Sequence, residues 1–189
     1  MKTRKKPVGQ SIRRLAVAVT LLLSVVVGGA RGQEKVTYGQ NMYLMKSLLP
    51  SLKNIGVIAS TLTQADIQSL GRAAAALGIK VSIAEVTEIR DVASMYKRLV
   101  NDYHVDIIWI PDKNDQLLLG IGFEYLRENT VVDRIGLFVP SKKFVTKGAL
   151  CSLERDNGQL TVYFNQRVAS VDGIKTPAQQ DNSVTYVMQ

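Results

Sequence analysis

Short polar and acidic side chains follow several apolar runs of this sequence, where together they could bind a solute. Ser60 and Thr61 follow one run, Asp112 and Asn114 a second, Ser141 a third and Glu154 a fourth. Hydroxyl, amide and carboxylate oxygens accept hydrogen bonds from the amine or hydroxyl groups of a small polar molecule. We therefore predict a ligand site made of Ser60, Thr61, Asp112, Asn114, Ser141 and Glu154.

Other roles compete with ligand binding at these positions. Asn114 suits the cap of a following helix, which leaves Asp112 to face the ligand. Asp112 could instead pair with Lys113 or Lys142 as an ordinary surface charge. Trp109 could form a wall of the site or pack beneath a helix. These alternatives stay open from the sequence alone.

Catalysis and metal binding lack the residues that they need. His104 is the only histidine and Cys151 the only cysteine, so neither a transition-metal site nor a nucleophile–base pair can be assembled. Residues 60–66 (STLTQAD) resemble a flavin phosphate loop, but they lack the glycine that lets backbone N–H groups approach a phosphate. We predict a non-catalytic protein with no cofactor, no metal site and no catalytic residues.

Apolar and amphipathic runs alternate along the chain, which indicates the elements that would position the site. Strands are predicted over 54–60, 80–86, 105–110, 134–139 and 149–153, and helices over 64–77, 90–103, 114–128 and 160–171. Residues 184–188 are a further candidate for an edge strand. The alternation predicts an α/β fold: an open, mostly parallel, doubly wound sheet of about five strands, flavodoxin-like or Rossmann-like, with helices on both faces. Such sheets bind ligands beyond the carboxyl ends of their strands.

The first 32 residues have the composition of a secretory signal peptide. They hold seven of the 24 Lys and Arg residues and none of the 16 Asp and Glu residues. A basic start, an apolar run over 15–27 and a small-residue end are typical of such signals, and a membrane span needs about 20 apolar residues. We predict cleavage after Gly32, or after Ala30, with an uncleaved anchor as the alternative. The expected divisions are a signal peptide (1–32), an extension with a leading helix (33–53) and one α/β domain (54–189).

Removing the signal peptide changes the charge balance of the chain. Taking seven basic residues from 24 leaves 17 against 16 acidic ones. The near-neutral balance gives no argument for binding nucleic acid or for an anionic membrane surface. Cys151 has no second cysteine for an intramolecular disulfide, and no cysteine at the cleavage site could carry a lipid. We expect a soluble periplasmic protein with no membrane insertion after cleavage.

Six segments, in this order, resemble the substrate-binding proteins of ABC importers, which have a type I periplasmic-binding fold. They are residues 44–60 (LMKSLLPSLKNIGVIAS), 76–81 (ALGIKV), 105–112 (VDIIWIPD), 134–141 (RIGLFVPS), 145–153 (VTKGALCSL) and 171–177 (VDGIKTP). The resemblance covers the second lobe of that family and nearly all of the chain after residue 32. It implies a single lobe like that of a periplasmic binding protein. This lobe would bind a small solute, amino-acid-like or otherwise polar, and would work with an ABC permease.

The chain also departs from the family pattern. Family members trap ligand between two lobes, whereas about twenty residues separate the signal peptide from the matching block, so we expect the first lobe to be absent. After the GALASL-like segment the family usually has glycine, where this chain has Glu154, a charge that would point towards the former cleft. The leading prediction is solute binding in support of uptake. The alternative is an interaction or dimerisation module whose cleft face meets an envelope protein or a second copy.

Overall fold

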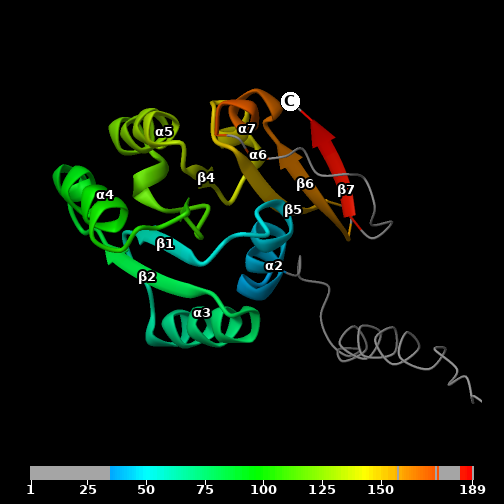
Figure 1. Ribbon diagram of the computed structural model, residues 1–189, viewed down its shortest axis with the longest axis horizontal. Coiled ribbons are helices and arrows are strands. Elements are labelled where there is room, and N and C mark those ends of the chain that lie inside the picture. Colours follow the sequence, from blue (N-terminus) through cyan, green and yellow to red (C-terminus); the bar gives the residue numbers. More distant parts are fainter. Residues whose placement is uncertain (1–34, 157, 173, 175–183, 189) are drawn as a thin grey trace, which may run out of the picture. The chain divides into compact units, whose positions relative to one another are not determined.

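A computed structural model describes residues 35–156, 158–172, 174 and 184–188, and its centre is a seven-stranded sheet (Figure 1). The strand order across the sheet is β2-β1-β3-β4-β5-β6-β7. The strands are β1 (Asn54–Ala59), β2 (Lys80–Glu85), β3 (Ile107–Trp109), β4 (Gly136–Phe138), β5 (Cys151–Asp156), β6 (Gln159–Phe164) and β7 (Val184–Met188).

The sheet is mostly parallel, with one antiparallel pair. Strands β1 to β5 run parallel to one another, β6 returns antiparallel to β5, and β7 lies parallel to β6 at the edge. The predicted α/β class, the mostly parallel sheet and the edge strand at the end of the chain are confirmed. The strand number of about five is too low, since β6 and β7 extend the sheet to seven.

Helices cover both faces of the sheet, as predicted for a doubly wound fold. They are α2 (Tyr38–Leu48), α3 (Gln64–Leu77), α4 (Val92–Asn101), α5 (Ile121–Asp133), α6 (Lys142–Val145) and α7 (Gln166–Asp172), with 3₁₀ turns η1 (Ile89–Asp91) and η2 (Gln116–Leu118). One buried apolar cluster joins the sheet to α2, α3 and α7, and a second joins it to α4, α5 and α6. Within the described residues, no helix has the length and apolar character that crossing a bilayer requires.

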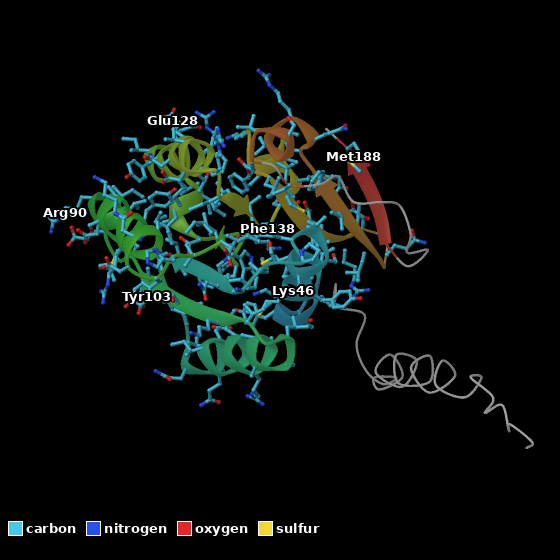
Figure 2. The ribbon with its side chains drawn as sticks, viewed as in Figure 1. Lys46, Arg90, Tyr103, Glu128, Phe138 and Met188 are labelled. Atoms are coloured by element: carbon cyan, nitrogen blue, oxygen red, sulfur yellow. The ribbon has the colours of Figure 1, made fainter. Side chains whose placement is uncertain are left out.

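Burial separates the interior from the surface of this domain. Phe138 on β4 is almost fully buried, and Figure 2 shows its side chain in the interior, whereas Arg90 and Glu128 lie at the surface. Because β1, β3, β4 and β5 are adjacent and parallel, their carboxyl ends lie side by side at the same end of the strands.

Helix α3 has the bounds predicted from its sequence, because both of its ends carry local signals. The Thr63 hydroxyl accepts from the Asp66 backbone N–H, and the Asp66 carboxylate accepts from the Thr63 N–H, which makes a complete capping box. At the other end, Gly78 adopts a left-handed conformation (φ 65°) that glycine takes without steric strain.

The helix predicted over 160–171 is wrong in its first half. Residues Gln159–Phe164 form β6, and the helix α7 begins only at Gln166. Leu160, Val162 and Phe164 alternate with Thr161 and Tyr163, and the two sets belong to opposite sides of the sheet. A run of β-branched and aromatic residues with period two favours a strand, and pairing with β5 decides the outcome.

The helix predicted over 114–128 is displaced along the chain. Its first part is the 3₁₀ turn η2, and α5 starts at Ile121 and continues to Asp133. Gly120 lies between them at φ 58° and ψ −126°, a conformation outside the helical region that only glycine adopts readily. This glycine interrupts what reads in the sequence as one continuous helical pattern.

Candidate solute-binding site

A pocket of about 530 Å³ lies at the carboxyl ends of the central strands. Its rim includes Pro111 and Pro140, which follow β3 and β4, and Leu153 within β5. Proline ends a strand because it cannot donate a ladder hydrogen bond. Pockets that hold small ligands in proteins commonly have volumes between about 300 and 1,000 Å³, so this volume suits a small solute.

The hairpin of β5 and β6 forms one wall of the pocket. β4 ends at Phe138, which pairs with Cys151, whereas β5 continues through Asp156 while paired to β6. Those five further residues extend β5 by roughly 16 Å past the carboxyl end of β4. The hairpin therefore projects beyond β3 and β4 and brings Glu154, Arg155 and Asp156 to the pocket.

The start of α2 and the residues just before it form another part of the lining. Lys35, Val36 and Asn41 line the pocket there. Thr37 caps α2 through a capping box with Gln40, which fixes the start of this helix. The residues from this segment were missing from the predicted site, because nothing local shows that the start of α2 returns to the strand ends.

Trp109 forms part of the pocket floor. Its side chain is only 1% exposed, and it packs edge-to-face against Tyr38 with 5.7 Å between ring centroids. The Tyr38 hydroxyl donates to Asp66 at 2.7 Å. Burial, followed by the hydrogen bond to Asp66, raises the pKa of Tyr38 well above its usual range, so its phenol stays protonated. Both roles that the sequence leaves open for Trp109 are thus fulfilled at once.

The two carboxylates that β5 brings to the pocket accept hydrogen bonds from neighbouring elements. Glu154 accepts from the backbone N–H of Lys142, and Asp156 accepts from the Tyr163 hydroxyl. The Lys142 Nζ lies 3.9 Å from Asp156 and 3.4 Å from the Tyr163 oxygen. The hydrogen bond with Tyr163, and then the nearby acidic charges, raise the pKa of Lys142. These contacts fasten the start of α6 to the projecting hairpin.

The structure brings together three of the six predicted site residues. Asp112, Asn114 and Glu154 line the pocket. Ser60, Thr61 and Ser141 also follow strand ends, but they are not among the residues that line it. Among the described residues, no Lys or Arg nitrogen lies within 4.0 Å of Asp112, so the ion pairs considered for this carboxylate are not formed.

The prediction that Asn114 caps the following helix is wrong. The Asn114 backbone N–H instead donates to Asp112 at 3.0 Å, and Asp115 caps the 3₁₀ turn η2 by accepting from the Leu117 N–H at 2.8 Å. Asp115 also accepts from the Ser60 N–H and is 5% exposed. Its position before an apolar run was the signal that could have identified it as the cap.

The remaining chemistry-bearing side chains lie away from the pocket. His104 precedes β3, at the amino ends of the strands, and is exposed in a left-handed conformation (φ 48°). Cys151 is fully buried, which raises the pKa of its thiol far above the usual range. In the part of the chain that the structure describes, no three His, Cys, Asp or Glu side chains converge in a way that could hold a metal ion.

Comparisons with solved structures show the same fold in larger proteins. A conserved domain protein from Vibrio cholerae matches with a TM-score of 0.65 and 19% identity, over 82% of this chain and 62% of that one. A ligand-free, open substrate-binding protein with adhesive properties from Clostridium difficile matches with a TM-score of 0.65 and 19% identity, over 81% and 60%. An ABC domain in complex with L-Trp from Streptococcus pneumoniae matches with a TM-score of 0.64 and 19% identity, over 77% and 60%.

This chain thus spans about three fifths of the length of each of these structures. Comparison with curated proteins found no significant match. The sequence profile of one family, described as ABC transporter substrate binding protein, matches residues 24–186. That match covers most of the sequence and agrees with the fold. The chain belongs to the ABC transporter substrate-binding protein family.

Proposed function

We propose that this protein is exported to the periplasm and binds a small polar solute in the pocket at the strand ends, in support of uptake by an ABC permease. The observation that carries the proposal is the pocket of about 530 Å³ beside Asp112, Asn114 and Glu154. The family match and the L-Trp bound to a structural neighbour support a solute of amino-acid size. The proposed role is non-catalytic, with no metal or cofactor.

The pocket offers both polar and apolar surface to such a solute. Asp112 uses one carboxylate oxygen for the Asn114 N–H, and the other can accept from an amine or hydroxyl. Trp109, Leu153 and Pro111 supply an apolar surface for the body of the solute. Polar groups that orient a solute, beside apolar surface that contacts its body, are typical of small-molecule sites.

The test uses protein purified from the periplasm after expression of the full-length chain. Thermal unfolding is measured with each of the common L-amino acids and with a set of small polyols and sugars. A ligand at a hundred times its Kd would add about 2.7 kcal/mol to the free energy of unfolding, which is a readily measured rise in melting temperature. Asp112→Ala should abolish the rise, whereas Asp102→Ala, a change at an exposed position after α4 that does not line the pocket, should preserve it. A protein that no solute stabilises would contradict the proposal.

A second function, an interaction or dimerisation module, is favoured by exposed aliphatic side chains beside Gly120. Leu119 is 68% exposed and Ile121 is 80% exposed, and Ile89 packs against Gly122 next to them. These exposed aliphatic side chains would supply the apolar surface for a contact with another protein. The contact would be made with a second copy or with an envelope protein.

Light scattering on the same purified protein separates the two functions. A dimer that Asp112→Arg or Ile121→Asp converts to monomer, together with no stabilisation by any solute, would favour the interaction module. A monomer that a solute stabilises would favour the solute binder.

A further inference from the structure

We infer that the solute carries an anionic group, a carboxylate or its equivalent, and that Arg155 recognises it. This inference rests on the proposed function, since it assigns the chemistry of a solute in the same pocket.

Strand alternation separates the acidic from the basic groups of the projecting hairpin. Successive side chains of a strand point to opposite faces, so Glu154 and Asp156 lie on one face of β5 and Arg155 on the other. The acidic pair is held on its face by Lys142 and Tyr163. Arg155 shares its face with Leu153, which belongs to the same apolar cluster as Trp109.

Among the described residues, Arg155 has a hydrogen-bond partner for only one of its donors. A guanidinium has five N–H donors. One of them, on Nη1, donates to the Gly158 carbonyl at 2.8 Å. The buried Nε–H has no acceptor among the described residues. A carboxylate placed against this guanidinium would accept two parallel hydrogen bonds, the geometry that arginine favours for such groups.

The other basic groups of the pocket also lack acidic partners. Lys35 lines the pocket from the segment before α2, and Lys113 lines it from the loop after β3. Within the described residues, no carboxylate oxygen approaches a nitrogen of Lys35, Lys113 or Arg155 to within 4.0 Å. Three basic groups therefore face the pocket without ion pairs, whereas Glu154 and Asp156 are engaged by the protein. Asp112 is the one carboxylate of the pocket with an oxygen still free, so the three unpaired basic groups outnumber it, and this balance suits a solute that carries an anionic group.

The test compares carboxylic acids with their primary amides, which have nearly the same shape and no charge. The probes are 3-phenylpropionate, indole-3-propionate and butyrate, each beside its amide, added to the protein purified from the periplasm. Affinities are measured by calorimetry. We expect at least one acid to bind roughly tenfold more tightly than its amide, the size of effect that a charge-assisted hydrogen bond supplies.

Variants of Arg155 show whether this residue causes the preference. Arg155→Gln should remove the difference between acid and amide while leaving the affinity for the amide unchanged. Arg155→Lys keeps the positive charge but loses the two parallel N–H donors of the guanidinium, so it should retain part of the difference in affinity between acid and amide. Arg72→Gln, the same change on the exposed surface of α3, is the matched control and should change nothing. If Arg155→Gln does not fold, the comparison rests on Arg155→Lys alone.

The outcomes distinguish this inference from the function on which it rests. Equal affinities for acid and amide, or a preference that survives in Arg155→Gln, would overturn the role of Arg155. If these acids do not bind but an uncharged or cationic solute stabilises the protein, the anion inference is wrong and the proposed function stands. If no solute of either set binds, both are wrong.

Discussion

Asp115 and Ser60, 55 positions apart in the chain, are joined by a hydrogen bond of 2.8 Å from the Ser60 backbone N–H to the Asp115 carboxylate. The second carboxylate oxygen accepts from the Leu117 N–H, also at 2.8 Å. One buried side chain thus fastens the end of β1 to the loop that follows β3. Because that loop carries Asp112 and Asn114, Asp115 holds the pocket rim in place without lining the pocket.

The first prediction concerns this buried carboxylate. Asp115→Ala leaves the two N–H donors without their acceptor, and we expect the free energy of unfolding to fall by about 2 to 3 kcal/mol. Asp102→Ala removes an exposed aspartate with no side-chain hydrogen bond to a described residue and should change stability by less than about 0.5 kcal/mol. Urea unfolding followed by circular dichroism measures both. Similar losses in the two variants would contradict the anchoring role of Asp115.

The second prediction compares two glycines. A methyl group on Gly136 in β4 would lie 2.6 Å from Leu150 Cδ2 and 3.4 Å from Ile174 Cδ1, both in buried side chains. Gly136→Ala should lower the free energy of unfolding by about 1 to 3 kcal/mol through overpacking. Gly71 lies on the exposed side of α3 with nothing within 4 Å of a new methyl group, so Gly71→Ala should raise stability by up to about 1 kcal/mol. Chemical denaturation measures both changes, and the same sign in both would refute this account of packing.

The third prediction concerns pH. Burial raises the pKa of Asp172, at the end of α7, to about 6, and neither carboxylate oxygen has a hydrogen-bond partner among the described residues. Between the ordinary aspartate pKa of about 4 and pH 6, the folded protein binds more protons at this site than the unfolded chain does. The contribution of Asp172 to stability is therefore favourable at low pH and is lost as the pH rises through 6.

Replacing this carboxylate should remove that pH dependence. Asp172 is only half-buried, so solvent screening reduces the effect, and we expect Asp172→Asn to be about 1 kcal/mol more stable than the parent at pH 7. At pH 4.5 the two proteins should be nearly equal. Urea unfolding at both pH values provides the measurement. Parallel pH profiles would show that Asp172 is ionised at little cost in the folded state.

The fourth prediction concerns export. Expression of the full-length sequence should give a periplasmic product that begins at Gln33, or at Arg31 if cleavage follows Ala30. Intact mass spectrometry of the periplasmic fraction identifies the first residue. A full-length cytoplasmic product would remove the case for export, and a full-length product in the membrane fraction would support an uncleaved anchor.

The sequence predicts elements well where their determinants are local. Thr63, Asp66 and Gly78 mark both ends of α3 within a few residues of the helix, and the apolar runs of β1 and β3 show that they are buried strands. β6 was missed because the spacing of Leu160 and Phe164 fits a helix as well as a strand. Only pairing with β5 selects the strand, and such pairing is not visible in a single segment.

The same limit applies to the site. Asp112, Asn114 and Glu154 could be predicted, because a parallel sheet places the residues after its strands at one edge. Lys35 and Asn41 reach the pocket through the path of α2, and Arg155 through the length of the β5–β6 hairpin. These placements depend on contacts between distant segments, which residue type and spacing do not encode.

Trp109 gives this protein an intrinsic optical probe. It is the only tryptophan in the sequence and lies under the pocket against Tyr38. Excitation at the red edge of the indole band, where tyrosine absorbs little, therefore reports on this one position. Its emission maximum follows the hydration of the pocket floor, while far-ultraviolet dichroism follows the helices of the whole domain. Local opening of the pocket can thus be told apart from global unfolding without attaching a dye.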